Sequence, residues 1–440
     1  MALCTFVDPG KNDWGRALRL LLALIEKEGS RVSDHHEHEH EREHELTRST
    51  ARTLRATGGQ ARRAVRRAFE SLRTGSTRTT QRASHIRDAI SVRRIFAVYL
   101  VALAPLIVFG LYNLGLQIHL AVAGEAELLE NWQTETMRAL GLGAFDPDSV
   151  LACLVHGALY FLPLLLTTWI TVRVVELLFA VIRREDLHPG AWIFALLFAL
   201  ILPPTAPIWQ AALAMAFGII VGKEIFGGTG RNVVHPMLLA WAFLFVSYPA
   251  TLSGEGVWVP VSTDQPMLID LAANNGMEGL AGIDWTTALI GLAPGPIGIT
   301  SSLLCFVGLG VLLLARIVSW RLTAGFILGS VVMAAAFSTG DPSNNPMFGI
   351  PPHWHMVIGG WAFGLAFIVT DPVTAAHTRT GRWVYGFLAG AFLILVRVLN
   401  PIQLDGTAIA LLFMSLFAAL IDHFVIEANV ARRRARYEAE

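Results

Sequence analysis

The sequence has little charge for its length. Only 15% of its 440 residues are charged and 54% are hydrophobic, whereas a typical soluble domain has about 25% charged residues. This shortfall excludes an ordinary water-soluble globular protein and points to lipid as the solvent. Basic and acidic residues balance at 34 each, so the net charge gives no indication of a nucleic-acid partner.

Cysteine is scarce as well. Cys4, Cys153 and Cys305 are far apart and form no Cys-x-x-Cys or Cys/His spacing. The sequence therefore indicates neither a disulfide framework nor a thiolate metal site. The first thirty residues also lack a cleavable secretory signal, because the short apolar run 18–25 has charges on both sides. We expect membrane insertion to depend on the internal apolar segments.

Residues 1–90 are predicted to form a polar, Arg- and His-rich cytoplasmic extension. Its tract HHEHEHE at 35–41 alternates imidazoles with carboxylates, a composition compatible with divalent metal binding. Nothing in the sequence fixes a ligand geometry, so a solvated low-complexity segment is the preferred interpretation. The Arg-rich stretch that follows, ending near Arg94, indicates either a helix on an anionic leaflet or a solvated helix.

From residue 95 onward, apolar runs recur between short polar breaks. A helix that rises about 1.5 Å per residue crosses about 30 Å of hydrocarbon in about 20 residues. We predict spans at 95–118, 150–182, 190–204, 206–223, 236–251, 301–316, 322–338, 355–370, 383–399 and 407–426. The expected fold is an all-α polytopic membrane protein with about ten transmembrane helices.

The loops predict an orientation. Basic breaks after alternate spans, together with a basic tail at 431–440, would face the cytoplasm under the positive-inside rule. The connections 119–149 and 252–300 are acidic, and the second contains no Lys or Arg, so both are expected to face outward. We therefore expect an inner-membrane protein with both termini in the cytoplasm.

The membrane domain, 91–430, contains an internal echo. Four landmarks recur in order at similar spacings: Pro203-Pro204, Ala216-Phe217-Gly218, Thr229-Gly230-Arg231 and Pro249, then Pro351-Pro352, Ala362-Phe363-Gly364, Thr380-Gly381-Arg382 and Pro401. This predicts two related five-helix halves, 91–251 and 301–430, joined by the loop 252–300. Pro-broken half-helices, as in many transport folds, are expected at 190–204 and after Pro351. Parallel and inverted relations of the halves both remain open.

Ionisable residues inside hydrocarbon are costly, so each is a functional candidate. Phe363, Phe367 and Asp371 follow at i, i+4 and i+8, which on a helix places two rings and a carboxylate on one face. One interpretation is a gate backed by a cation ligand. The alternative is a helix C-terminus, with Asp371 starting a turn before Pro372 and the rings as ordinary packing.

Four further features are candidates for a structural or a functional role. Glu224 and Asp422 lie at predicted cytoplasmic ends of spans, where a carboxylate is either solvated or a ligand for a hard cation. Arg173 and Glu176, at i and i+3, are expected to pair structurally. Gly227 and Gly228, with the nearby Arg231, are candidates for phosphate binding through backbone N–H groups, although the strand context of a nucleotide fold is missing. The residues of HWH at 353–355 either cap a half-helix or approach a cofactor, and their i, i+2 spacing argues against a metal pair.

Ordered motifs across residues 84–436 carry a resemblance to a known family. They include SHIRD at 84–88, KEIFGGTGRN at 223–232, TDPV at 370–373, VRVLNP at 396–401 and Asp422-His423-Phe424. The chain resembles the B subunit of sodium-translocating NADH:quinone reductases, whose fold is shared with the D subunit of Rnf electron-transport complexes. The entry motif, the long extension and the basic tail resemble the quinone reductase protein more than its Rnf relative.

The resemblance implies a translocase subunit that works only with the other subunits of its membrane complex, in the lipid bilayer and with ubiquinone. Electrons would pass from NADH to ubiquinone while Na+ leaves the cell. The family binds riboflavin and carries FMN joined to a threonine in a Ser-Gly-Ala-Thr motif. The family positions for the aromatic constriction and the ion path fall on Phe363, Phe367, Asp371, Asp422 and Glu224.

The chain departs from the family where FMN should be attached. Ser262 aligns with the motif serine, but Gln265 then replaces the threonine and cannot form the phosphoester; Thr263 is one slip away as a substitute acceptor. Trp241 and Ile299 replace an expected Arg and Glu. Covalent FMN is expected to be absent unless Thr263 accepts it. Two alternatives stay open: an Rnf-type subunit, and a channel or transporter that kept the fold without covalent flavin.

Overall fold

The computed structural model describes residues 92–128, 130–142, 145–183, 190, 192–252, 261, 266–400 and 405–438. By its contacts the chain divides into two compact units, Met1–Arg73 and Thr74–Glu440, and every described residue belongs to the second. The predicted extension 1–90 and the candidate flavin acceptor Thr263 lie outside the described residues.

Helices account for all regular structure in the described part of the chain, apart from one isolated antiparallel bridge between Leu128 and Val261. Five helices are long and apolar enough to cross a membrane. They are α2 (Val92–Ala123), α4 (Val150–Arg183), α12 (Trp320–Phe337), α15 (Arg379–Leu399) and α16 (Thr407–Tyr437). The prediction of an all-α polytopic membrane protein is confirmed.

The other apolar runs form shorter helices. These are α5 (Trp192–Ile201), α6 (Ile208–Ile219) with its π-helical continuation η1 (Ile220–Glu224), α7 (Pro236–Ser247) and α11 (Ser302–Leu314). At about 1.5 Å per residue, the ten residues of α5 extend only about 15 Å, half of a bilayer. Nine of its ten residues are buried, as expected for a helix that is apolar on every side. The half-helix predicted within 190–204 is therefore present.

The predicted span 355–370 is wrong as a continuous helix. The chain forms α13 (Pro352–His355), turns, and resumes as α14 (Trp361–Phe363) and the π-helix η4 (Gly364–Ile368). Gly359 in the turn has φ +65°, a conformation that is costly for residues with a Cβ. Hydropathy alone missed the break because the turn residues are themselves apolar.

The remaining described helices lie in or beside the two connections that were predicted to face outward. They are α3 (Trp132–Ala139), α8 (Pro249–Leu252), α9 (Leu268–Leu280) and α10 (Trp285–Ile290), and a short 3-10 turn, η3 (Pro346–Gly349), precedes α13. Asp270 sits in the first turn of α9, where a carboxylate is favoured by the helix dipole.

The internal echo has a local structural counterpart. Ala216-Phe217-Gly218 leads into η1, and Ala362-Phe363-Gly364 leads into η4, so both echoed stretches pass from α-helix to π-helix. Segments of π-helix are rare in proteins, and those that occur are often found at functional sites. The division of the whole membrane domain into two related halves stays a prediction.

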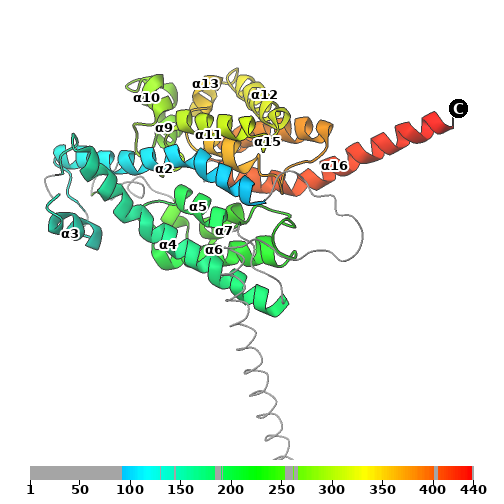
Figure 1. Cartoon of the computed structure of the whole chain (residues 1–440). Coiled ribbons are helices and arrows are strands. Elements are labelled where there is room, and N and C mark those ends of the chain that lie inside the picture. The colour runs from blue at the N-terminus through cyan, green and yellow to red at the C-terminus, as the bar shows by residue number, and fades with distance from the viewer. Residues whose placement is uncertain are drawn as a thin grey trace, which may run out of the picture. The chain divides into compact units, whose positions relative to one another are not determined.

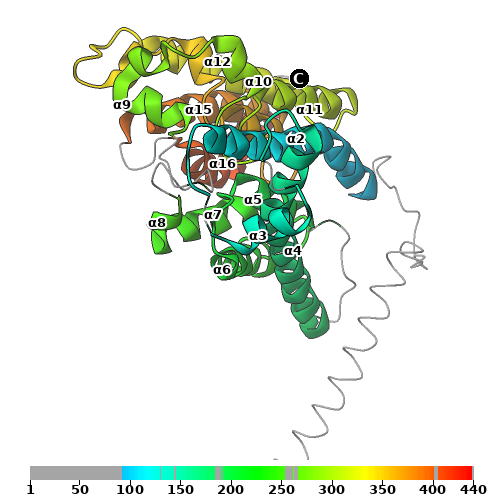
Figure 2. The same ribbon diagram turned by 90° about the vertical axis from the view of Figure 1, so that its left-hand side faces the viewer.

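Two helix pairs pack at very short range through glycine (Figures 1 and 2). Between α2 and α4, a Cβ on Gly115 would overlap the Cys153 carbonyl, and one on Gly157 would overlap the Leu111 carbonyl. Between α12 and α15, Gly329 and Gly390 stand in the same relation to Phe387 and Phe326. Small residues at crossings let membrane helices approach closely, and here they fix the frame around the shorter helices.

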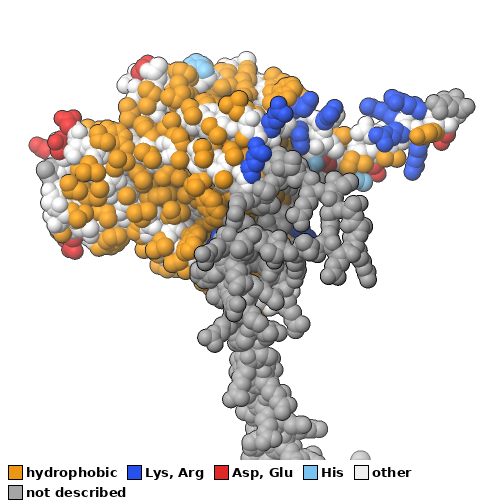
Figure 3. Space-filling view, in the orientation of Figure 1, with side chains coloured by type: hydrophobic (Ala, Val, Ile, Leu, Met, Phe, Trp, Pro, Cys, Tyr) orange, Lys and Arg blue, Asp and Glu red, His pale blue; other side chains and the backbone are white. Residues whose placement is uncertain are grey.

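The surface carries its charge at the ends (Figure 3). Large apolar side chains such as Val101, Leu151 and Leu178 are more than half exposed on the outer faces of α2 and α4, which is typical of lipid contact. Glu125 and Glu130 are exposed in the connection after α2, whereas the exposed arginines 432–434 continue α16. The predicted orientation, with the basic end in the cytoplasm, stays a prediction.

We expect Gly329→Leu to lower the thermal midpoint of the purified complex, because the new side chain collides with the Phe387 carbonyl and forces α12 away from α15. Overpacking of this kind costs about 1–3 kcal/mol or more. Gly310→Leu in α11 is the matched control, since a Cβ there meets no atom within 4 Å. Equal thermal midpoints for the two variants would contradict the close packing.

Candidate functional site

Phe363 and Phe367 form a buried aromatic pair where α14 becomes η4. Their ring centroids are 5.3 Å apart with planes tilted by 52°, and the two residues are 1% and 0% exposed. Glycines face both rings: a Cβ on Gly298 would lie 3.2 Å from Phe363 Cε2, and one on Gly308 would lie 2.7 Å from Phe367 Cζ. The pair therefore fills the space between η4, α11 and the segment that precedes α11.

Broken backbone surrounds this pair. The Gly298 N–H donates to the Leu200 carbonyl of α5 at 2.8 Å, and the Ser302 hydroxyl donates to the Val357 carbonyl at 2.9 Å. The end of α5, the start of α11 and the turn before α14 thus meet in the bundle. Helix ends leave backbone groups that the helix itself does not pair, and these are what a transport site in a membrane uses.

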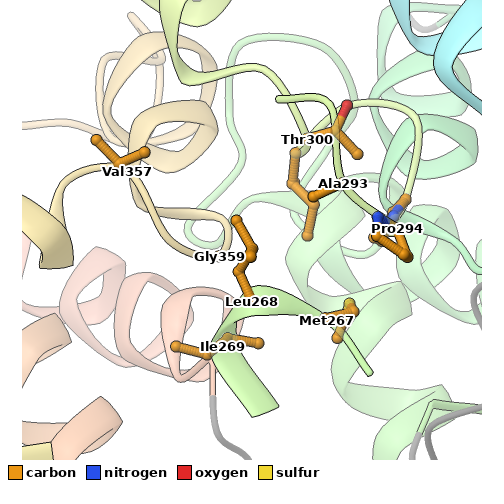
Figure 4. A pocket seen from close by; sticks show the side chains of 11 residues that line it. Met267, Leu268, Ile269, Ala293, Pro294, Thr300, Val357 and Gly359 are labelled. Carbon is orange, nitrogen blue, oxygen red and sulfur yellow. The ribbon is translucent and has the colours of Figure 1, made fainter. Parts of the chain in front are cut away.

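A small cavity lies between two of these breaks (Figure 4). It measures about 30 Å³ and is lined by Met267, Leu268 and Ile269 of α9, by the segment 293–300, and by Val357 and Gly359. The Thr300 hydroxyl is buried and has no hydrogen-bond partner in the described structure. A cavity of this volume has room for about one water molecule.

Asp371 is not on the helical face that its spacing predicted, because η4 ends at Ile368. Its Oδ2 accepts from the Thr374 N–H at 2.9 Å and from the Thr374 hydroxyl at 2.8 Å, so the carboxylate does organise a turn. The side chain is half-buried. The carboxylate therefore forms the turn that one interpretation expected, and its role as an ion ligand is a proposal.

Asp422 joins α16 to the start of α15. It accepts from the His377 N–H at 2.6 Å, the Thr378 N–H at 3.1 Å and the Thr378 hydroxyl at 2.6 Å. The Thr378 hydroxyl in turn accepts from the Gly381 N–H, which caps α15. The Asp422 carboxylate therefore fixes the start of α15, a role that its position near the end of a predicted span did not indicate.

Glu224 belongs to a buried charge network between α4 and η1. It pairs with Arg183 at 2.9 Å and with Lys223 at 3.4 Å. Lys223 also contacts Glu176, which pairs with Arg173 at 3.2 Å, so the predicted Arg173–Glu176 pair is confirmed. Three cations and two carboxylates leave one positive charge in excess.

The glycine-rich loop after η1 is shaped by positive φ angles at Gly227, Gly228 and Gly230, of +108°, +92° and +87°. Guanidinium groups flank it: a Cβ on Gly227 would lie 3.0 Å from Arg231 Nη1, and one on Gly228 would lie 3.4 Å from Arg183 Nη1. The candidate residues Gly227, Gly228 and Arg231 are therefore together, and Arg183 is a second cation that the sequence did not indicate.

Polar atoms without a hydrogen-bond partner also occur in the described segment between this loop and α7. In the described structure, Thr229 Oγ1, Asn232 Oδ1 and His235 Nδ1 are buried without a hydrogen-bond partner. Buried polar groups are almost always paired, so three such atoms within seven residues indicate a place where a polar ligand or water is bound. The sequence signal for Asn232 was its position in the motif KEIFGGTGRN, and His235 gave none.

The HWH motif ends α13. His355 is buried and neither ring nitrogen has a partner in the described structure, while the backbone carbonyl of His353 accepts from the Trp285 indole at 3.4 Å. Among the described residues no group of three or more His, Cys, Asp or Glu could hold a metal ion. The motif therefore lies at the break before α14, and the capping and cofactor interpretations both stay predictions.

A larger cleft lies in the connection that precedes α11. It has a volume of about 580 Å³ and is lined by Gln117, by Pro266 to Leu271, by the start of α10 and by 292–294. Cofactor pockets are typically about 300–1,000 Å³. Pro266 follows directly after the segment that contains Thr263.

Comparison with known proteins identifies relatives over most of the chain. A family model described as the NQR2, RnfD, RnfE family matches residues 79–431. The chain is 45% identical over 371 residues to the B subunit of the Na(+)-translocating NADH-quinone reductase of Pseudomonas paraeruginosa, covering 83% of this chain and 91% of the relative. The corresponding protein of Pseudomonas aeruginosa is 46% identical with the same coverage. That of Azotobacter vinelandii is 44% identical over 363 residues, or 81% of this chain and 90% of the relative.

These matches include the segments that form the aromatic pair, the glycine-rich loop and the broken helices, since all of them lie within residues 79–431. The chain belongs to the NQR2, RnfD, RnfE family.

Proposed function

We propose that the chain is the B-type membrane subunit of a sodium-translocating NADH:quinone reductase, and that Na+ passes the Phe363–Phe367 pair. The observation that carries the ion path is the meeting of three chain breaks around two buried rings at the junction of α14 and the π-helix η4. The names of the curated relatives support the reaction. Broken helices in a membrane offer carbonyl oxygens, which are ligands that a hard cation accepts.

In this proposal the rings close the path and the carboxylates attract the ion. Asp371 lies three residues beyond η4, and Asp422 fixes the turn before α15. Moving one charge against about 100 mV costs about 2.3 kcal/mol, which one electron supplies when it falls through the same potential difference. The protein must therefore open the path only while an electron moves. Glu224, which already holds two cations, shapes the entrance electrostatically and is not a free ligand.

The described residues offer two places for flavin, and flavins supply one- and two-electron transfer when bound. In the described structure, Thr229, Asn232 and His235 have buried polar atoms without a partner that riboflavin would engage, and the guanidinium groups of Arg183 and Arg231 flank the glycine-rich loop at Gly227 and Gly228. The 580 Å³ cleft beside Pro266 suits FMN. Because the family threonine is replaced by Gln265, we propose that FMN is held there without a covalent bond unless Thr263 forms one.

The partners follow from the same assignment. Further subunits that oxidise NADH, ubiquinone as the electron acceptor, and the lipid of a bacterial inner membrane are proposed on the strength of the relatives' names and the five apolar spans. The basic continuation of α16 supports a cytoplasmic C-terminus, and with an even number of spans the N-terminus would lie on the same side.

We expect Phe367→Ala to lower the Na+ exported per quinone reduced by about tenfold. Removal of the ring lowers the barrier to ion movement through the constriction by about 1.4 kcal/mol, so that ions move without electron flow. The measurement is ²²Na+ uptake by inverted vesicles alongside quinone reduction. Phe392→Ala, in a stacked pair with Phe413, is the control and should keep the wild-type ratio. An unchanged ratio of Na+ exported to quinone reduced in Phe367→Ala would contradict the proposed constriction.

The two interpretations of Asp371 make different predictions. Asp371→Asn removes the charge, and Thr374→Val removes the hydroxyl that donates to the carboxylate. If Asp371 attracts the ion, the first variant raises the Na+ concentration for half-maximal quinone reduction by about tenfold, as for the loss of a charged ligand, and the second leaves it near wild type. Equal shifts in both would mean that Asp371 acts only through its turn.

We expect the denatured chain to show no flavin fluorescence in a gel and to have the mass of the unmodified polypeptide, because a glutamine cannot form the phosphoester. Covalently bound flavin survives denaturation, whereas bound but unlinked flavin is lost. A fluorescent band that disappears in Thr263→Val would instead identify Thr263 as the acceptor.

A further inference from the structure

Arg397 is a fully buried cation near the C-terminal end of α15. Its side chain is 0% exposed. The guanidinium donates from Nη1 to the His355 carbonyl at 2.7 Å, from Nη2 to Asp405 Oδ1 at 2.9 Å and from Nε to the Asp405 carbonyl at 3.1 Å. A buried charge persists only when it is paired and hydrogen-bonded. Three acceptors on two chain segments therefore fix this side chain in place.

Asp405, which lies just before α16, gathers further donors on the same oxygen. Its Oδ1 accepts from the Gly360 N–H at 2.8 Å and from the Thr407 hydroxyl at 3.1 Å. A Cβ on Gly360 would lie 2.8 Å from Oδ2, and one on Gly359 would overlap Oδ1. The carboxylate is thus pressed against the backbone of the turn before α14.

The ion pair holds both sides of one chain break. His355, whose carbonyl binds Arg397, is the last residue of α13, and Gly360, whose N–H binds Asp405, is the N-cap of α14. The Ser302 hydroxyl also holds the Val357 carbonyl of the turn between them, and Gly359 in this turn adopts a positive φ angle. Arg397 and Asp405 therefore determine where α14 begins and in which direction it runs.

The aromatic pair is only three residues further along. The methyl carbon of Thr407 lies 2.8 Å from where a Cβ of Gly364 would be, so the start of α16 also packs against the fragment that carries Phe363 and Phe367. A displacement of Asp405 is passed to the rings through the Gly360 N–H and through Thr407.

Stability alone is a poor explanation for this pair. Desolvation of two charges cancels most of their attraction, so an apolar pair of similar size is often as stable. What an apolar pair lacks is direction, because hydrogen bonds to charged groups fix geometry as well as energy. Five such bonds converge here, and all of them involve Arg397 or Asp405.

We propose that Arg397 and Asp405 are positioning residues for the ion constriction: their ion pair, between a fully buried guanidinium and a carboxylate that is 24% exposed, sets the start of α14 and thereby the place of Phe363 and Phe367. The inference rests on the proposed path of Na+ past these rings. It assigns a role to two residues that touch neither the ion nor a cofactor.

The test uses the complete complex carrying Asp405→Asn, Phe367→Ala, or both, with Na+ exported per quinone reduced as the readout. Asp405→Asn keeps the size of the side chain and removes its charge. We expect about a tenfold fall in the ratio for each single variant. Because both changes act on the same rings, the double variant should also fall about tenfold, and not about a hundredfold as independent sites would.

Two controls separate positioning from damage. NADH oxidation with a soluble electron acceptor reports assembly and should stay at the wild-type rate in Asp405→Asn. Should Asp405→Asn fail to assemble, Thr407→Val removes one donor to the same carboxylate, keeps the methyl contact with Gly364 and should lower the ratio about threefold, since it removes one hydrogen bond of the set.

The failures can be told apart. If Phe367→Ala lowers the ratio but Asp405→Asn does not, or if the two effects multiply, the positioning role is wrong while the ion path stands. If Phe367→Ala itself leaves the ratio unchanged, the ion path is wrong and the inference falls with it.

Discussion

The pairing of backbone groups inside a lipid-embedded bundle is the constraint on which the rest of this structure depends. In hydrocarbon an unpaired N–H or C=O costs several kcal/mol, so irregular backbone persists only where protein supplies the partner. The chain nevertheless stops helices after Ile201, before Ser302 and after His355. Specific hydrogen bonds close these breaks: the Gly298 N–H donates to the Leu200 carbonyl, the Ser302 hydroxyl donates to the Val357 carbonyl, and the Gly360 N–H donates to the Asp405 carboxylate. The aromatic pair lies where these hydrogen-bonded chain breaks meet.

Much of the architecture follows from the sequence because hydrophobic length is a strong signal. The runs 95–118, 150–182, 383–399 and 407–426 correspond to α2, α4, α15 and α16, each somewhat longer than predicted because helices continue through flanking arginines. The prediction of a continuous span at 355–370 was wrong because hydropathy depends only on composition and does not detect a change in the direction of the chain. A turn made of apolar residues and glycine looks the same as a helix in such a sum.

The candidate site was predictable in its residues and less so in their roles. Spacing identified Phe363 and Phe367 as neighbours, and they are, but the π-helix moved Asp371 off their face. Glu224 and Asp422 were identified as carboxylates at the ends of predicted spans, yet both have partners that lie about 40 positions away, which no local pattern contains. Arg397 escaped notice because an arginine in an apolar run near a helix end is usually assumed to reach for water.

The π-helical turn at η4 has a consequence for how such a constriction changes between relatives. Each residue of an α-helix turns the chain by about 100°, and a π-turn accommodates one extra residue without ending the helix. Loss of a single residue between Phe363 and Phe367 would return the segment to a regular α-helix, leave the residues after it on nearly the same face, and bring the two rings to i, i+3 spacing. A one-residue deletion would therefore change the geometry of the proposed constriction with both aromatic side chains retained.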